Sequence, residues 1–158
     1  MGLKEVQEEF ARKGITNEIL TMDESTATVE LAAAALGTEP GEIAKSMAFK
    51  LKDDSVIIVV FMGTARIDNR KFKDRFHCKA TMLTAEETPL LTGHPVGGVC
   101  PFGLPENVTV YLDESLKKYE AVYPAAGNRH NAVRFTIPEL EAATGAEWVD
   151  VGKIPEEA

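Results

Sequence analysis

The chain has 158 residues, of which 44% are hydrophobic and 27% are charged, with a formal net charge of −8. This length and composition are typical of one globular domain and exclude a disordered tail protein, so we expect one domain over residues 1–158. The net charge argues against nonspecific coating of DNA, because Lys and Arg supply most of the affinity for phosphate.

No feature of the sequence indicates secretion or a membrane. The first ten residues have no apolar signal-peptide core, and the longest apolar run, residues 56–62, is too short to span a bilayer. Cys78 and Cys100 lie 22 positions apart without metal-ligand spacing, which favours two reduced thiols. We therefore expect a soluble, cytoplasmic protein with no membrane or DNA partner, and nothing implies a metal or another cofactor.

The first half of the chain predicts alternating helices and strands. Residues 3–13 have helical spacing before Gly14, residues 15–21 are expected to form a strand, and residues 29–36 form an alanine-rich helix that ends at Gly37. Residues 45–51 alternate as a strand, and the β-branched residues 56–61 predict a strand buried on both faces at the centre of the sheet.

The second half predicts more elements in a less regular order. A helix is expected at residues 68–76, followed by a capping box at residues 84–87 and by a second capping box formed by Thr136 and Glu139, with Pro138 in the first turn of a helix that ends at Gly145. Strands are expected at residues 108–112, 121–124, 133–137 and 148–151. About six or seven strands with four or five helices favour an α/β fold with a mixed sheet and helices outside it.

Residues 93–103 form the most unusual segment, with four glycines and two prolines among eleven residues. Such a backbone can direct bare N–H groups at a ligand oxygen, as in a phosphate nest or an oxyanion hole. A tight structural turn is the alternative.

Lys45 is in register with Met47, Phe49 and Leu51, on the face of the strand that points to the core. A lysine there must either extend its amine to water or meet an acceptor in a cleft. The second arrangement would make Lys45 a ligand clamp.

Two further groups of residues are less specific. His77, His94 and His130 are isolated in sequence, and a surface or core role is the simpler interpretation for each. Between Arg66 and Lys79, six basic residues stand against two acidic ones, so a phosphate-facing patch and a solvated helix face both fit. The common motifs for nucleotide binding, serine esterases and zinc proteases are missing.

Several of these segments together resemble a known family. They are residues 43–47, Gly93 with residues 97–99, residues 101–103, residues 111–113 and residues 127–129. Over residues 20–150 they are similar to the YbaK-like family, which includes free-standing relatives of the editing domain inserted in bacterial prolyl-tRNA synthetases. The lysine followed at this distance by a GGxxPxG loop is the specific part of the resemblance.

The resemblance implies a curled, barrel-like mixed sheet surrounded by helices, and a deacylase that removes a mischarged small amino acid from tRNA, typically tRNA for proline. Aminoacyl-tRNA is then the expected partner, and prolyl-tRNA synthetase is a second candidate. The expected catalytic residues are Lys45, Gly98 and Asp113. The expected substrate-binding residues are Ser46, Met47, His94, Gly97, Pro101, Gly103, Gly127 and Asn128, and the expected tRNA-binding residues are Arg70, Lys71 and Lys73.

The expected chemistry needs no protein nucleophile, because an aminoacyl ester is already activated. Backbone N–H groups of residues 97–103 would stabilise the oxyanion, and Lys45 would anchor the substrate carbonyl or the terminal phosphate and ribose. Two alternatives remain: a hydrolase of small free esters, and a noncatalytic module that binds aminoacylated tRNA ends or a synthetase. The amino acid removed stays open.

Overall fold

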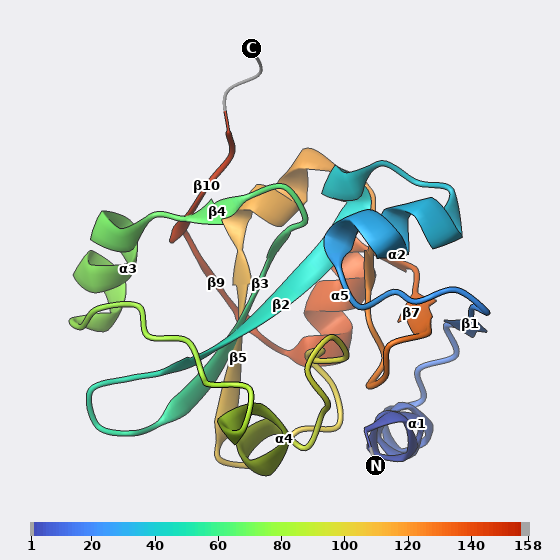
Figure 1. The fold of residues 1–158 in the computed structure, drawn as a ribbon, viewed down its shortest axis with the longest axis horizontal. Helices are drawn as coiled ribbons and strands as arrows, with labels where there is room; N and C mark the ends of the chain where they lie inside the picture. Colours follow the sequence, from blue (N-terminus) through green and yellow to red (C-terminus); the bar gives the residue numbers. More distant parts are fainter. Residues whose placement is uncertain (1, 156–158) are drawn as a thin grey trace.

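A six-stranded mixed sheet forms the centre of the molecule in the computed structural model, which describes residues 2–155 (Figure 1). The strand order is β8-β6-β2-β3-β5-β9, and the sheet is strongly twisted and curled. The antiparallel pairs are β2–β3 and β6–β8, whereas β2–β6, β3–β5 and β5–β9 are parallel. The strands are β2 (Ile43–Lys50), β3 (Val56–Met62), β5 (Val108–Asp113), β6 (Ala121–Pro124), β8 (Phe135–Thr136) and β9 (Glu147–Val149).

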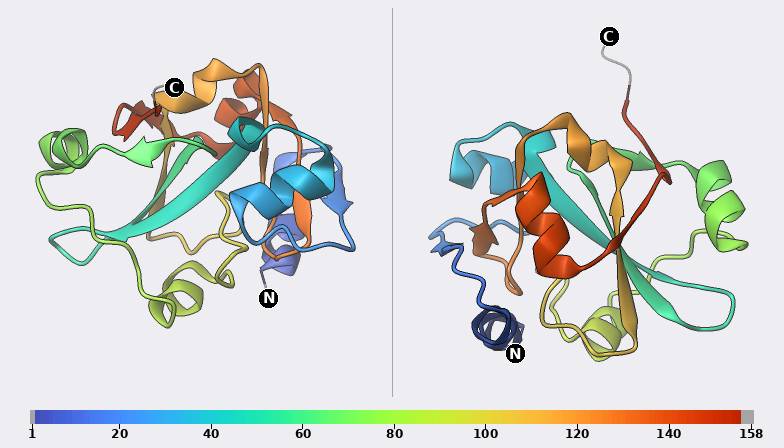
Figure 2. Two further views of the ribbon diagram at one scale, coloured as in Figure 1. Left: turned by 45° about the horizontal axis from the view of Figure 1, so that its top comes forward. Right: turned by 180° about the vertical axis from the view of Figure 1, so that it is seen from behind.

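Helices and two small sheets surround this central sheet (Figure 2). One small sheet pairs β1 (Ile19–Thr21) with β7 (Asn131–Val133), and the other pairs β4 (Arg66–Ile67) with β10 (Gly152–Lys153). The helices are α1 (Leu3–Lys13), α2 (Val29–Leu36), α3 (Asn69–Phe76), α4 (Glu87–Thr92) and α5 (Ile137–Thr144), with short 3-10 turns at η1 (Pro40–Glu42) and η2 (Glu114–Lys118). No helix within residues 2–155 has the length and hydrophobicity needed to cross a membrane. The mixed α/β class with a curled sheet is confirmed.

The strand β3 lies inside the sheet with all seven of its residues buried. Ile58 and Val60 belong to the hydrophobic cluster on one face of the sheet, and Ile57, Val59 and Phe61 belong to the cluster on the other. A strand with apolar neighbours on both faces needs apolar residues at every position, as the sequence predicted.

The predicted helix ends agree well with the structure. Gly14, Gly37 and Gly145 each adopt the left-handed conformation after a helix, where glycine lacks the steric penalty of a Cβ. The capping box of Thr136 and Glu139 is present, and Asp68 caps α3 through the N–H of Lys71. These helix ends depend on local bonds, which explains why the sequence predicted them.

Three predicted strands differ from the structure. Only residues 19–21 of the first become a strand, because pairing with β7 begins at Ile19. The strand expected at residues 133–137 is divided: Val133 pairs with β1, Phe135 pairs with β6, and Ile137 already begins α5. The last strand, expected at residues 148–151, ends at Val149, since the N–H of Val151 donates to the Asp113 carboxylate instead of a strand.

Candidate active site

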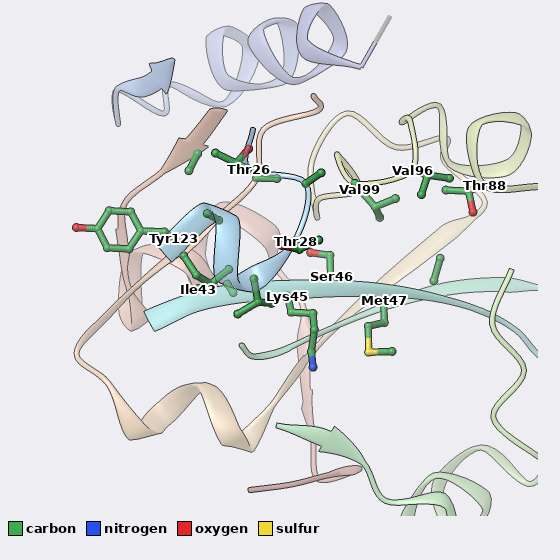
Figure 3. Close-up of a pocket in the computed structure, with 18 of the residues that line it drawn as sticks. Thr26, Thr28, Ile43, Lys45, Ser46, Met47, Thr88, Val96, Val99 and Tyr123 are labelled. Carbon is green, nitrogen blue, oxygen red and sulfur yellow. The ribbon is translucent and has the colours of Figure 1, made fainter. Parts of the chain in front are cut away.

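A cavity of about 400 Å³ lies along one edge of β2, between the segment that leads into α2 and the glycine-rich loop (Figure 3). Residues 43–48 form one wall, and residues 26–29 form a second. Val96, Gly97 and Val99 contribute the loop side, and residues from Met82 to Thr88 form a further side. Tyr123, Ala125, Asn131 and Ala132 complete the lining, so six segments of the chain meet here.

The cavity exists because β2 lacks a continuous neighbour on the edge away from β3. Strand β6 pairs with β2 only at Ile43 and Ala44. Further along the same edge, the N–H of Leu83 donates to Ala48 O, and the backbone N–H of Lys50 donates to Thr81 O. The edge is open between these two pairings, at Ser46.

Small apolar side chains line much of the cavity, including Ala27, Ala32, Ala44, Ala48 and Val99. Its threonines at positions 26 and 88 donate to carbonyl oxygens of the chain. No Asp or Glu lines the cavity within the described part of the chain. This surface fits a small, mostly apolar group.

Lys45 belongs to the cavity wall, but its amine lies on the other face of β2. Figure 3 shows Lys45 and Met47 on one side of the strand and Ser46 on the side toward Thr28. The Nζ of Lys45 donates to Ala65 O at 2.5 Å. Burial lowers the pKa of this amine, with Arg66 acting in the same direction and Glu30 opposing it. The amine therefore does not meet the glycine loop in this conformation.

The glycines at positions 97 and 98 are required by close packing. Gly97 has φ 87°, and a Cβ there would lie 2.9 Å from Ala27 Cβ; a Cβ on Gly98 would lie 2.8 Å from Asn128 Cα. The Gly98 N–H donates to Pro95 O at 2.9 Å, so it is used within the turn. Among the described residues, the N–H groups of Gly97 and Val99 have no such partner. The loop is thus both a tight turn and a cavity wall.

The rest of the glycine-rich segment packs in the core. His94 is fully buried, with its Nε2 2.6 Å from Phe102 O and 3.6 Å from Cys100 Sγ. Burial lowers the pKa of His94 and raises the pKa of Cys100 to about 12. A Cβ on Gly103 would lie 2.8 Å from the N atom of Val6, which shows that Gly103 packs against α1.

Three more expected substrate-binding residues lie outside the cavity wall. Pro101 is buried, Gly127 approaches Gly2 closely, and Asn128 packs behind Gly98. The structure thus brings Lys45, Ser46, Met47 and Gly97 to the cavity, whereas His94, Gly98, Pro101, Gly103, Gly127 and Asn128 form or support the loop without lining it.

Asp113 lies at the end of β5, away from the cavity, and is 1% exposed. Its carboxylate accepts from the N–H groups of Ser115, Val151 and Gly152 at 2.8–3.0 Å. A carboxylate that joins three backbone donors holds the C-terminal segment on the sheet. This geometry favours a structural part for Asp113 in place of the expected catalytic one.

The expected tRNA-binding residues lie on α3. Arg70 and Lys73 are exposed, whereas Lys71 bonds Asp150 and Gly152 O. Figure 1 places α3 beside β4, so this helix is separate from the cavity.

Sequence reasoning missed much of the cavity wall. Thr26, Ala27 and Thr28 precede α2, and the only local signal there is the helix cap at Thr28, whose side chain accepts from Leu31 N–H. Met82 and Leu83 were missed as well, and no local pattern marks them. Their proximity depends on the curl of the sheet.

Comparison with known proteins assigns the family. The model of the aminoacyl-tRNA editing domain matches residues 23–143. The chain belongs to the aminoacyl-tRNA editing domain family. This editing domain is 44% identical to the uncharacterized protein YwhH of Bacillus subtilis, over 97% of this chain and 98% of that protein.

Two other similarities agree with this family. The editing domain is 25% identical to an Enterococcus faecalis protein named "Putative Cys-tRNA(Pro)/Cys-tRNA(Cys) deacylase EbsC", over 78% of this chain and 76% of that one. A solved structure titled as "a putative trans-editing enzyme for prolyl tRNA synthetase" superposes with a TM-score of 0.87 at 32% identity, covering 96% of this chain and 97% of the other. The family resemblance inferred from the sequence is confirmed.

Proposed function

We propose that this editing domain is an aminoacyl-tRNA deacylase that hydrolyses the ester between a small amino acid and the 3′ end of tRNA, with tRNA for proline as the first candidate. The observation that supports this most directly is the cavity of about 400 Å³, walled by alanine and valine side chains, within the segment that matches the editing family. Such a cavity would accept the amino acid and leave the tRNA outside.

The reaction is the addition of water to the ester carbonyl, followed by cleavage of the bond between the acyl carbon and the ribose oxygen. The products are the free amino acid and a tRNA whose ribose oxygen has taken up a proton. No histidine or acidic side chain lines the cavity in residues 2–155, so no activated serine is proposed. The chain's part is to bind and polarise the ester.

The N–H groups of Gly97 and Val99 are the proposed donors to the developing oxyanion, because both are at the cavity and Gly98 N–H is occupied. One well-placed donor of this kind is worth roughly a hundredfold to a thousandfold in rate in other enzymes. This refines the expectation for the whole segment of residues 97–103.

Lys45 is the proposed anchor for the terminal phosphate and ribose of the tRNA. Its amine lies on the side of β2 that faces β4 and α3 in Figure 3, close enough to Arg66 for that charge to lower its pKa. Exchange of its bond to Ala65 O for a phosphate oxygen would keep a donor–acceptor pair. The exposed Arg70 and Lys73 would meet phosphates further along the acceptor stem.

An editing step of this kind meets a physical need. One methylene group separates small amino acids by only about 1–3 kcal/mol in a synthetase pocket. A second cavity, restricted to small side chains, can remove the products of such errors. The walls of this cavity fit that second selection.

The test is a deacylation panel in which Ala, Ser, Thr, Cys and Pro are each charged on tRNA for proline, with Lys45→Ala as the matched control. We expect hydrolysis of at least one of the small non-proline esters, and much slower hydrolysis of that ester by the control. Inactivity on all five would contradict the reaction on this tRNA. A turnover rate that does not depend on salt and is equally high with small free esters would instead indicate a general esterase. Binding of the charged tRNA without turnover would indicate a noncatalytic module.

A further inference from the structure

Ser46 has three polar groups without a hydrogen-bond partner among the described residues. Its backbone N–H and C=O lie in the gap between the pairing of Ala44 with β6 and the bond from Leu83 to Ala48. Its Oγ is buried and also lacks a partner. Ser46 is half-buried and lines the cavity, so these groups are available to bond a molecule that enters it.

The backbone groups of Ser46 point toward the open edge of β2. The backbone N–H of Lys50 donates to Thr81 O, and the C=O of Ala48 accepts from Leu83 N–H. The even-numbered residues of β2 therefore direct their backbone N–H and C=O groups away from β3. Backbone direction alternates with a period of two along a strand, and Ser46 is the next even position. Because Ser46 also lines the cavity, its N–H and C=O form part of the wall.

We propose that this open edge binds the main-chain atoms of the aminoacyl group. The Ser46 C=O accepts a hydrogen bond from the α-ammonium group, and the Ser46 N–H donates to the ester carbonyl oxygen. An aminoacyl group has its nitrogen and carbonyl oxygen at the spacing of one residue, and opposed residues of an antiparallel pair exchange just these two bonds. The inference rests on the proposed function and identifies the residue that orients its substrate.

The charge of the cavity supports this arrangement. An α-ammonium group needs an acceptor when it leaves water, and the described part of the chain supplies no Asp or Glu in the wall. The hydroxyls of Thr26 and Thr88 already donate to carbonyl oxygens. The unpartnered Ser46 C=O is therefore an acceptor available to this group in the wall.

The same pairing orients the rest of the substrate. In an antiparallel pair, directly opposed side chains lie on the same face, so an L-amino acid side chain would lie on the Ser46 face, toward Thr28 in Figure 3. The carbonyl end runs opposite to β2, toward Lys45. This direction agrees with Lys45 as the anchor of the ribose and phosphate.

The test uses the ¹⁵N-labelled full chain and 3′-(L-alanylamino)-3′-deoxyadenosine, an amide that cannot undergo the ester hydrolysis. We expect the Ser46 amide signal to shift and its hydrogen exchange to slow at least tenfold on saturation. The Lys50 amide, which already donates to Thr81 O on the same edge, is the internal control and should not change. The propionyl analogue, which lacks the α-amino group, should bind roughly tenfold or more weakly, the effect of one bond to a charged group.

Three results would overturn the inference: no binding of the alanyl probe, binding that leaves the Ser46 amide unchanged, or equal affinity for the propionyl probe. The deacylation panel is scored separately. If the protein hydrolyses an ester of the panel but the Ser46 amide is unchanged by the probe, binding at the Ser46 edge is wrong and the deacylase function stands. If the probe protects the Ser46 amide but no ester is hydrolysed, the deacylase function is wrong and binding at the Ser46 edge stands.

Discussion

Lys45 and Ser46 are adjacent in β2 and serve opposite faces of the sheet. The amine of Lys45 bonds Ala65 O on one side, while the Ser46 side chain faces Thr28 on the other (Figure 3). A small acyl group beside Ser46 and a phosphate beside Lys45 can therefore be bound by one strand. Neither residue needs to act as an acid or base in this arrangement.

Substitution Lys45→Ala is expected to lower kcat/KM for deacylation roughly 10- to 100-fold, because it removes a charge-assisted hydrogen bond to the substrate. The fold should persist, since the side chain is only partly buried. Steady-state kinetics with the best ester of the panel would measure the effect. Lys50→Ala, on the same strand but paired with Glu87 outside the cavity, should leave kcat/KM within about twofold; equal losses in both variants would refute the anchor.

Asp113 is expected to act on stability. Asp113→Asn weakens three bonds to backbone N–H groups and should lower the free energy of unfolding by about 2 kcal/mol or more. Urea denaturation measures this change. Since Asp113 does not line the cavity, kcat/KM of the folded variant should stay near the original value. A large decrease of kcat/KM with unchanged stability would instead indicate that Asp113 takes part in catalysis.

The glycine-rich loop is divided between the cavity and the core. Val96, Gly97 and Val99 line the cavity, whereas His94 and Phe102 are fully buried and bonded to each other. The buried half holds the loop in place, so under the proposed function the amides of Gly97 and Val99 would need little rearrangement to meet a substrate oxygen. Preorganised donors of this kind give the largest electrostatic benefit in catalysis.

Helix α3 offers a separate prediction. The double substitution Arg70→Glu with Lys73→Glu should weaken binding of tRNA. It should also reduce the slope of log K against the logarithm of the salt concentration by about 1–2 in magnitude, because each phosphate contact contributes roughly 0.7–0.9 to that slope. Binding titrations from low to moderate salt would measure it. Lys4→Glu with Arg12→Glu on α1 is the matched control, with the same change in charge on exposed residues elsewhere. Equal effects of the two pairs would show that only net charge matters.

The stability of the whole domain should depend on pH through His94. Burial lowers the pKa of His94 in the folded state, so the unfolded chain, with a histidine pKa of about 6.5, takes up the proton first as pH falls. The stability contributed by neutral His94 is therefore present above about pH 6.5 and is lost below it, by at most about 1.4 kcal/mol per pH unit.

Urea midpoints measured from pH 7.5 to pH 5.5 would test this dependence. His94→Asn should flatten the curve, although it lowers stability at every pH. His77→Asn is the control, because His77 is exposed and has a left-handed backbone that asparagine accepts. If both variants keep the original slope, another group determines it.

Much of the molecule follows from local signals. The buried run at residues 56–62, the helix at residues 29–36 with Gly37 after it, and the capping box at Thr136 were all predictable, because periodicity and caps depend on residues within a few positions of one another. The same holds for the spacing of Lys45 and the glycine loop, from which the family was inferred. Strand ends such as those near Arg134 were not predictable, since they depend on distant partners.

The composition of the candidate site depended on contacts between segments far apart in sequence. Alternation along β2 placed Lys45 and Met47 on one face, but only the ending of β6 at Pro124 and the bridge from Phe49 to Met82 left the edge open at Ser46. Likewise, Asp113 ends a strand, and only the packed structure brings three backbone N–H groups to its carboxylate. Local order is encoded by neighbouring residues, whereas an open strand edge or a satisfied carboxylate exists only once distant segments have packed.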